Sequence, residues 1–197
     1  LERIGFETVI EWPNVADTEA FRATAATTDR APRRVVFGGN VTPYKVDLDL
    51  VERIATELSD IDLILAGPLD AGGAGKWSDP QRLVDLGVTL AGTLTLAELA
   101  ELYSTATVGI IPYLQNEYTH GVNPLKLYEY FAAGLAVVST PVPSVAQVEL
   151  SDADLRVESD HACFVKAVDE MATPPTSGDL TRRRDIADAN SWTGRGE

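Results

Sequence analysis

Two short segments of the sequence carry residue types that could bind an anion. The first runs from Gly38 to Lys45 and reads GGNVTPYK. Adjacent glycines let a ligand approach the backbone closely, and a lysine a few residues later can reach a phosphate as a point charge. The spacing matches neither a P-loop nor a G-x-G-x-x-G motif. The segment alone therefore leaves two interpretations open, a phosphate-binding loop and a tight turn between a strand and a helix.

The second segment reads NPLKLYEY and begins at Asn123 and Pro124, which are typical of a helix start. The first turn of a helix presents unpaired N–H groups and the positive end of the helix dipole, which together favour an anion. Lys126 falls in this turn, where its charge opposes the dipole, and such a placement indicates a ligand nearby. Glu129, three residues later, can share a helix face with Lys126. A binding site and an ordinary surface ion pair both remain open.

Short apolar runs alternate with helical patterns and predict where these segments lie. We expect strands at 35–37, 61–66, 88–91, 108–112, 135–139 and 155–157, and helices at 47–58, 80–86, 95–104, 123–134, 159–172 and 180–189. Nearly all-apolar strands between helices predict a parallel sheet covered on both faces, the Rossmann-like, doubly wound α/β class. A ligand lies at the carboxyl ends of such strands, near a switch in strand order. Both segments described above belong to that edge.

The composition limits the classes of function. The chain has 197 residues, with 16 Lys and Arg against 30 Asp and Glu, and its net charge of −14 excludes a general binder of nucleic acid. A single cysteine excludes a disulfide framework and a cysteine-rich metal site, and is typical of a reducing, cytoplasmic setting. No apolar run approaches the roughly 20 residues of a membrane helix. The arginines at 182–184 are predicted to lie on a solvated helix face. Their contact with the inner face of a membrane is the weaker interpretation.

Several other residues are predicted to be structural. Three D-x-D triplets are expected to cap helices or face solvent, so no metal site is expected. His161 is expected to be structural, and Cys163 and Met171 are expected to fill the core beneath their helix. Tyr128 and Tyr130 cannot share one helix face, so at least one of them is expected in the core or at a domain contact.

Taken together, the segments resemble the C-terminal half of GT-B glycosyltransferases, most closely the retaining family called glycosyl transferases group 1 or family 4. The order and spacing of FGGNVTPYK, LILAGP, IIPY, NPLKLYEYFAAG and AVVSTP carry the resemblance. It implies that the Rossmann-like domain forms one half of a GT-B architecture. It also implies a glycosyltransferase of the hexosyltransferase type that uses a UDP- or GDP-linked sugar, retains the anomeric configuration and needs no metal or other cofactor.

The resemblance also implies roles for individual residues. Lys45 matches the family's phosphate lysine, and Glu129 matches the second glutamate of an E-x₇-E element, which holds the ribose hydroxyls. The first glutamate of that element would fall at Gly121, and a companion arginine would fall at Asn40. We expect Lys126 to replace the missing cation and to form the catalytic set with Lys45 and Glu129.

Further donor contacts are implied in the loops that follow the strands. Asn123, His120 or backbone groups are expected to meet the sugar hydroxyls, and the base is expected to lie against backbone groups of the loops after the second and third strands. The donor-binding residues expected on this basis are Gly38, Gly39, Asn40, Gly67, Pro68, Gly92, Thr93, Leu94, His120, Gly121, Val122, Asn123, Pro124 and Leu125.

The sequence begins at Leu1 without a signal-peptide pattern, and we expect it to be a piece of a longer chain. Residues 1–31 are assigned to an interdomain linker and N-terminal extension, and residues 32–197 to one nucleotide-sugar-binding domain. The acceptor is expected on an N-terminal domain of the same protein, so this chain alone should bind the donor without transferring sugar. Two alternatives are a non-catalytic nucleotide-sugar-binding module, which Asn40 and Gly121 keep open, and a GT-B-like sugar epimerase.

Overall fold

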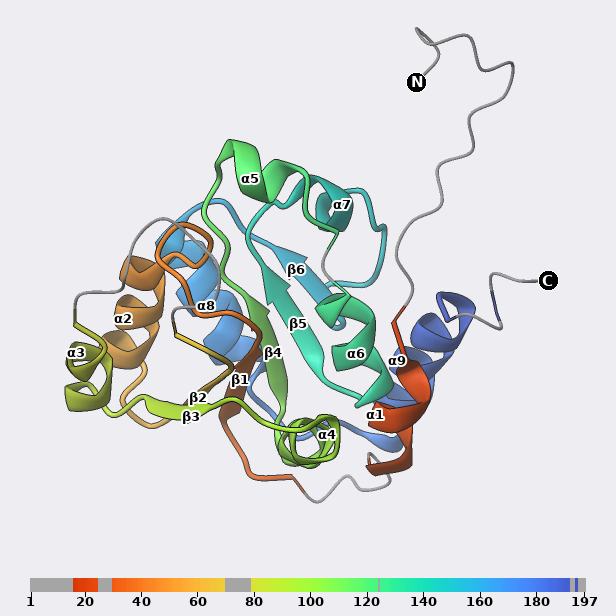
Figure 1. The fold of residues 1–197 in the computed structure, drawn as a ribbon. Helices are drawn as coiled ribbons and strands as arrows, with labels where there is room; N and C mark the ends of the chain where they lie inside the picture. Colours follow the sequence, from red (N-terminus) through yellow and green to blue (C-terminus); the bar gives the residue numbers. More distant parts are fainter. Residues whose placement is uncertain (1–15, 25–29, 70–78, 124, 192–193, 195–197) are drawn as a thin grey trace, which may run out of the picture.

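A computed structural model describes residues 16–24, 30–69, 79–123, 125–191 and 194 (Figure 1). Six parallel strands form one sheet, in the order β3-β2-β1-β4-β5-β6. The strands are β1 (Arg34–Gly38), β2 (Asp62–Ala66), β3 (Thr89–Gly92), β4 (Val108–Ile111), β5 (Ala136–Ser139) and β6 (Leu155–Val157). Every strand predicted from the sequence is present, and the Rossmann-like α/β class is confirmed.

Helices cover both faces of this sheet (Figure 1). On one face α2 packs against α8; on the other, α4 and α6 contact the strands, and α1 and α9 pack against α6. Short helices α5 and α7 follow β4 and β5 at the carboxyl edge of the sheet. The described helices are α1 (Thr18–Thr24), α2 (Leu48–Glu57), α3 (Gln81–Asp85), α4 (Leu96–Thr105), α5 (Glu117–His120), α6 (Lys126–Ala132), α7 (Pro143–Ala146), α8 (His161–Met171) and α9 (Ser177–Ala189).

Side-chain caps fix where several helices begin. Asp47 accepts from the backbone N–H of Leu50 at the start of α2, and Thr95 and Glu98 form a capping box at the start of α4. The predicted start of α3 is corrected by one residue, because Pro80 holds the position before the helix and makes no side-chain cap. The carboxylate of Asp47 also lies 2.9 Å from Nε2 of His161, so this histidine joins α8 to α2, as its predicted structural role requires.

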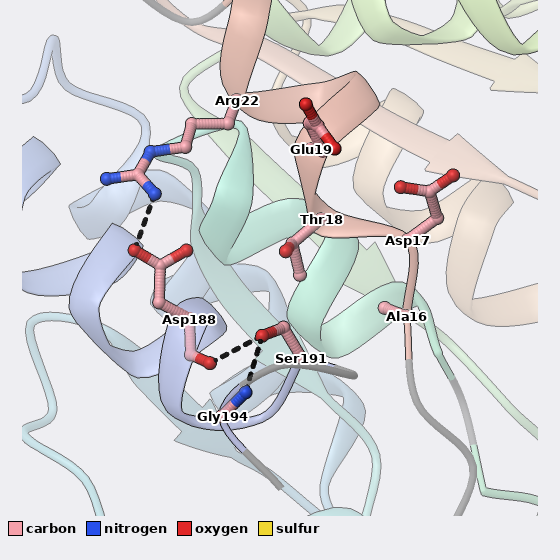
Figure 2. Close-up of a pocket in the computed structure, with 8 residues that line it drawn as sticks. All are labelled: Ala16, Asp17, Thr18, Glu19, Arg22, Asp188, Ser191 and Gly194. Carbon is pink, nitrogen blue, oxygen red and sulfur yellow. Dashed lines mark hydrogen bonds and ion pairs between the residues drawn. The ribbon is translucent and has the colours of Figure 1, made fainter. Parts of the chain in front are cut away.

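The first described helix belongs to the same core as the rest of the domain. Phe21 of α1 is buried and stacks on Tyr103 of α4 with 5.3 Å between ring centroids. Arg22 forms a 2.7 Å ion pair with Asp188 of α9, beside a hollow of about 620 Å³ whose lining Figure 2 shows. None of the site residues predicted from the sequence lines this hollow. Residues 1–15 lie outside the described residues, and the domain boundary after residue 31 stays a prediction, although α1 already contributes to the core.

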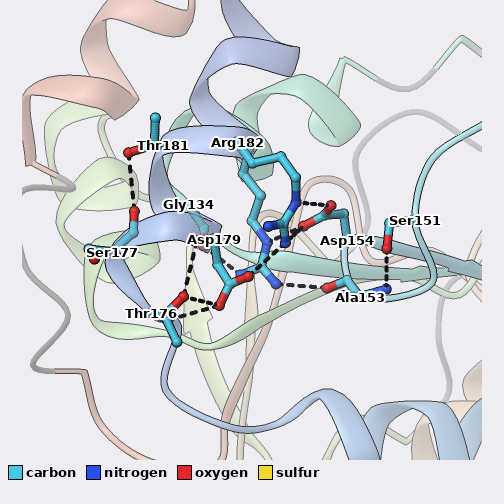
Figure 3. Close-up of polar contacts among 10 residues, drawn as sticks. Gly134, Ser151, Ala153, Asp154, Thr176, Ser177, Asp179, Thr181 and Arg182 are labelled. Atoms are coloured by element: carbon cyan, nitrogen blue, oxygen red, sulfur yellow. Dashed lines mark hydrogen bonds and ion pairs between the residues drawn. The ribbon is translucent and has the colours of Figure 1, made fainter.

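The arginine run at 182–184 is not the solvated helix face that the sequence suggested. Arg183 is buried and donates to Asp154, at 2.9 Å, and to the carbonyl oxygen of Gly134, at 3.0 Å. Arg182 binds the same carboxylate through two hydrogen bonds of 2.6 and 2.8 Å (Figure 3). Successive helix residues point about 100° apart, so one arginine of the run faces inward. The cluster fastens α9 to the start of β6 and to the turn after α6.

The predicted position of Cys163 in the core is also wrong. Its backbone N–H donates to the Asp160 side chain that caps α8, and its own side chain is exposed. The buried face of this helix is formed by Phe164, Val165, Ala167 and Val168. Met171 packs against the core as a partly buried residue, as predicted. Within the described ranges, no helix is both long enough and apolar enough to cross a membrane.

We predict that Asp154→Ala lowers the free energy of unfolding by about 3–5 kcal/mol, because it leaves the buried Arg183 guanidinium without its counter-charge. Urea denaturation measures the change. The matched control is Glu57→Ala, which removes a carboxylate paired with an arginine on the exposed face of α2 and should change the midpoint little. Equal losses for the two variants would contradict a special role for the buried pair.

Candidate functional site

The strand order places a candidate site between β1 and β4. The chain proceeds from β1 to β2 and β3 in one direction, then crosses back to β4, β5 and β6 in the other. At such a switch point the two connecting loops diverge and leave a crevice at the carboxyl ends of the strands. The loops concerned are those after β1 and β4, which contain the two anion-binding segments singled out in the sequence.

The turn after β1 is shaped by glycine. Gly39 has a φ of +140°, and a Cβ there would lie 2.6 Å from Nζ of Lys126, so no other residue fits without displacing that side chain. Gly67, at the end of β2, has a φ of +139°, and a Cβ there would collide with the carbonyl oxygen of Gly39. The structure thus places Lys126 of α6 directly over the glycine turn that follows β1.

Two lysines lie at this switch point, where a crevice is expected. Nζ of Lys45 lies 4.8 Å from the ring centroid of Tyr113, and Nζ of Lys126 lies 6.0 Å from that of Phe37. The two rings pack edge to face with their centroids 6.2 Å apart. Within the described part of the chain, neither ammonium group forms an ion pair with a carboxylate. Two partly buried cations that form no ion pair make this the strongest candidate for an anion site.

The electrostatics of the pair follow from burial and repulsion. Burial, and then the charge of Lys126, lower the pKa of Lys45 from 10.5 to about 8. Burial also lowers the pKa of Lys126, against the opposing effect of the carboxylate of Glu129. The pKa of Glu129 is itself raised by burial, while the charge of Lys126 lowers it. The free crevice therefore holds cations at a cost that a bound anion would relieve.

Backbone hydrogen bonds hold the two loops together. Val46 and Tyr113 form an isolated antiparallel bridge, and Asp47 donates its N–H to the carbonyl oxygen of Pro112 at 2.8 Å. The N–H of Leu114 donates to the carbonyl oxygen of Lys45 at 2.9 Å. Because these bonds join the segment that carries Lys45 to the end of β4, the lysine backbone is fixed relative to the crevice.

The loops expected to hold a base adjoin the glycine turn. Gly67 donates its N–H to the carbonyl oxygen of Gly92 at 2.7 Å, and the N–H of Val41 donates to that of Pro68 at 2.9 Å. Thr93 is exposed, whereas Asn40 and Leu94 are half-buried. The loops after β1, β2 and β3 thus form one continuous edge, as the sequence indicated.

The expected sugar-side residues lie around the short helix α5. His120 and Gly121 are exposed at its end, and Val122, Asn123 and Leu125 are half-buried. Ser144 of α7 donates to the carbonyl oxygen of Val122 at 2.9 Å and so ties this loop to the segment after β5. Pro124 lies outside the described residues. No group of three or more histidine, cysteine, aspartate or glutamate side chains with metal-binding geometry occurs within the described ranges.

Two features of the site went beyond the sequence patterns. Tyr128 and Tyr130 are both buried, and the Tyr130 hydroxyl reaches the backbone of β1 and β4. Tyr44, beside Lys45, packs edge to face on exposed Tyr118 of α5 with 5.2 Å between ring centroids. The spacing of Tyr128 and Tyr130 predicted that at least one of them faces inward, but only the fold shows that both are buried and which rings meet.

Comparison with known proteins finds one family that matches most of the chain. The family described as "Glycosyl transferases group 1" matches residues 32–173. The chain is 30% identical over 198 aligned residues to the "Putative teichuronic acid biosynthesis glycosyltransferase TuaH" of Bacillus subtilis (strain 168); the match covers 95% of this chain and 49% of that protein. The chain therefore spans about half the length of this curated relative.

Solved structures share the fold at lower identity. Alr3699/HepE of Anabaena, solved in complex with UDP and glucose, has a TM-score of 0.60 at 15% identity, covering 89% of this chain and 48% of that one. AviGT4, a glycosyltransferase involved in avilamycin A biosynthesis, has a TM-score of 0.61 at 17% identity, and the match covers 97% of this chain and 55% of that one. The α,α-trehalose 6-phosphate synthase of Burkholderia multivorans has a TM-score of 0.66 at 14% identity, and the match covers 93% of this chain and 48% of that one.

We predict that the affinity of the crevice for a diphosphate falls as pH rises through about 8, because Lys45 loses its proton there and a bound anion favours the charged form. Calorimetry with methyl diphosphate measures the affinity at each pH. The terminal phosphate of this ligand loses its last proton near a pKa of about 6, so the charge of the ligand stays constant at higher pH. Proton uptake should accompany binding near pH 8. Lys45→Arg stays charged throughout and is the matched control. Equal pH profiles for the wild type and this variant would contradict the prediction.

The same shift predicts a change in stability with pH. Between a folded pKa of about 8 and an unfolded value of 10.5, the unfolded chain binds more protons at Lys45 than the folded chain does. The contribution of Lys45 to the free energy of unfolding should therefore rise with pH in this window. Lys45→Gln should remove that rise and stabilise the free chain at pH 7, as measured by urea denaturation. A less stable Lys45→Gln variant at pH 7 would contradict the assignment.

Proposed function

The chain belongs to the glycosyl transferases of group 1, and on that premise we propose that it binds a nucleotide-diphosphate sugar as the donor for glycosyl transfer. One observation carries the proposal. Lys126 lies over the glycine turn at the switch in strand order, and Lys45 is close enough for the charge of Lys126 to lower its pKa; neither lysine forms an ion pair with a described carboxylate. A diphosphate offers the negative charge, compact shape and acceptor oxygens that this crevice would match.

The reaction would concentrate charge where the lysines lie. When the glycosidic bond to the donor breaks, the leaving group is the nucleoside diphosphate, and its phosphate oxygens gain negative charge. Ammonium groups and backbone N–H groups that are already oriented toward those oxygens stabilise that charge more in the transition state than in the ground state. In this proposal Lys45 and Lys126 supply the positive charge, and no metal or other cofactor is required.

Glu129 is proposed to accept hydrogen bonds from the ribose hydroxyls. It lies on the first turn of α6, three residues after Lys126, and its burial favours hydrogen-bonded contact over exposure to water. Retention of the anomeric configuration, a UDP- or GDP-linked hexose, and a cytoplasmic location stay part of the proposal. They rest on the resemblance of the sequence motifs and, for the location, on the single cysteine.

The acceptor is proposed to bind to a part of the protein outside this chain. The chain matches only 49% of the length of TuaH and 48% of that of HepE. An N-terminal acceptor-binding domain would supply the other wall of the cleft. The 197-residue chain alone would then bind the donor with little turnover.

A non-catalytic nucleotide-sugar-binding module is the second candidate. Gly121, where the family pattern carries a carboxylate, is exposed and offers no side chain to a sugar. The half-buried Asn40 likewise brings no positive charge. If this chain binds the donor but the complete protein transfers no sugar, the non-catalytic module is the correct interpretation.

We predict that at least one of UDP, GDP, UDP-glucose and GDP-mannose binds the chain in a calorimetric titration, and that Glu129→Ala weakens that binding by about tenfold or more, the effect of losing a hydrogen bond to a charged group. The 2′-deoxy form of the same nucleotide should bind the wild type more weakly and lose much less affinity on the substitution. Glu117→Ala, which removes an exposed carboxylate of α5, is the matched control.

Each contrary outcome identifies a different error. A folded wild-type chain that binds none of the four compounds would overturn the proposed function. Equal losses for the ribose and deoxyribose forms would leave donor binding intact but remove Glu129 from the ribose contact.

A further inference from the structure

The pairing of β1 with β4 stops before either strand ends. Val35 pairs with Val108 and Val36 with Gly109, and no later pair follows. Yet β1 continues to Gly38 and β4 continues to Ile111. By contrast, β1 stays paired with β2 up to its last residue. The two central strands therefore separate at the switch point, directly beneath the candidate site.

The alternation of backbone groups shows which hydrogen bond is missing. The N–H of Gly39 donates to the carbonyl oxygen of Ala66 in β2, and the carbonyl oxygen of Ile111 accepts from Thr140, which follows β5. Neighbouring residues along a strand direct their backbone groups to opposite sides. The N–H of Gly38 and the carbonyl oxygen of Ile110 therefore face each other between β1 and β4, as partners for the next rung of the ladder.

The hydroxyl of Tyr130 occupies the place of that rung. It accepts from the N–H of Gly38 at 3.1 Å and can donate to the carbonyl oxygen of Ile110 at 3.3 Å. Both backbone groups thus find a partner without touching each other, and the side chain of Tyr130 is fully buried. One hydroxyl from α6 is inserted into the ladder between the two central strands.

The surrounding sequence accommodates the insertion. A Cβ on Gly109 would meet the Tyr130 ring, so glycine makes room for it in β4. The rung after the missing one would need an N–H from residue 112, which is a proline and has none. The separation of the strands is therefore supported by residue types on β1, β4 and α6 together.

We propose that Tyr130 is a positioning residue for donor binding, which acts by holding the carboxyl ends of β1 and β4 apart. The proposal rests on the proposed function. Gly38 and Gly39 form the phosphate-facing turn, and Glu129 and Lys126 lie on the same helix as Tyr130. A hydroxyl that bonds the turn from that helix sets the distance between the two halves of the site. It touches no ligand itself.

Removing the hydroxyl alone changes this geometry. In Tyr130→Phe the ring still fills the space over Gly109, but the N–H of Gly38 and the carbonyl oxygen of Ile110 lose their shared partner. They either stay unpaired or move together to form the direct rung. In the first case the glycine turn loses the bond that holds it to α6, and in the second it shifts relative to α6; either way a diphosphate no longer meets both halves in one fixed geometry.

The matched control is Tyr103→Phe. Tyr103 of α4 is equally buried, and its ring lies 5.0 Å from that of Tyr130, centroid to centroid. Its hydroxyl forms no hydrogen bond to the backbone of the described residues. The control therefore removes a buried hydroxyl that contacts Tyr130 and lies against Gly38 but does not itself bridge β1 and β4.

The experiment is calorimetric titration of wild-type chain and both variants with UDP and GDP, with thermal unfolding of each. We expect Tyr130→Phe to weaken the binding of the nucleotide that the wild type binds by about tenfold or more, and Tyr103→Phe to change it by less than about twofold. The Gly38 amide should exchange with solvent faster in Tyr130→Phe than in Tyr103→Phe, because only Tyr130 accepts its hydrogen bond.

The outcomes separate this proposal from the one on which it rests. If the wild type binds neither these nucleotides nor UDP-glucose or GDP-mannose, the proposed function fails and the positioning role fails with it. If the wild type binds and Tyr130→Phe binds equally well, only the positioning role is overturned. Equal losses of affinity in the two variants, following equal losses of thermal stability, would also overturn it, because a general packing effect would then explain both.

Discussion

The repulsion between two partly buried lysines is the constraint on which the site depends. The charge of Lys126 lowers the pKa of Lys45, and burial lowers the pKa of both groups. Left to itself, such a pair would separate into solvent or lose a proton. It stays together because each lysine is held by a different rigid part: Lys45 by the loop bonded to the end of β4, and Lys126 by the first turn of α6.

The rest of the fold keeps those two parts in place. The strand order brings the ends of β1 and β4 together, and Tyr130 fixes α6 to both strands. On the far side of α6, the pair of Arg183 and Asp154 fastens α9 against the turn that ends the helix. These buried polar contacts specify geometry more than they add stability, since a buried ion pair is often no more stabilising than apolar packing.

The sequence predicted the parts of this structure that depend on local patterns. Apolar runs located all six strands. The predicted starts of α2 and α4 agree with the caps that Asp47 and Thr95 form there. The prediction failed where a residue's environment is set by a distant segment. Arg183 is buried against Asp154, which lies 29 residues away, and nothing beside Arg183 in the sequence indicates that partner. A different reason applies to Cys163, which lies outside the face of α8 that Phe164 and Val168 bury.

The candidate site shows the same division. Lys126 could be singled out because a cation at a helix start opposes the dipole, and its odd placement was visible in the sequence alone. The role of Tyr130 could not, because periodicity shows only that a tyrosine faces inward. That its hydroxyl replaces a backbone rung depends on the register of β1 against β4, and a shift of one residue would direct other backbone groups into the gap.

The negative net charge of the chain opposes the binding of an anion, and the two lysines must overcome that repulsion. A net charge of −14 repels a diphosphate at long range, but over distances greater than about 8–10 Å that repulsion is screened at physiological salt. Close to the buried lysines the effective dielectric constant is lower than in water, so the nearby positive charges act strongly on a bound anion. The net charge therefore opposes the rate of encounter, whereas the local pair governs how long a bound anion stays. An acidic protein can hold an anionic ligand in this way, provided that its few cations are rigid, close together and not joined in ion pairs with its own carboxylates.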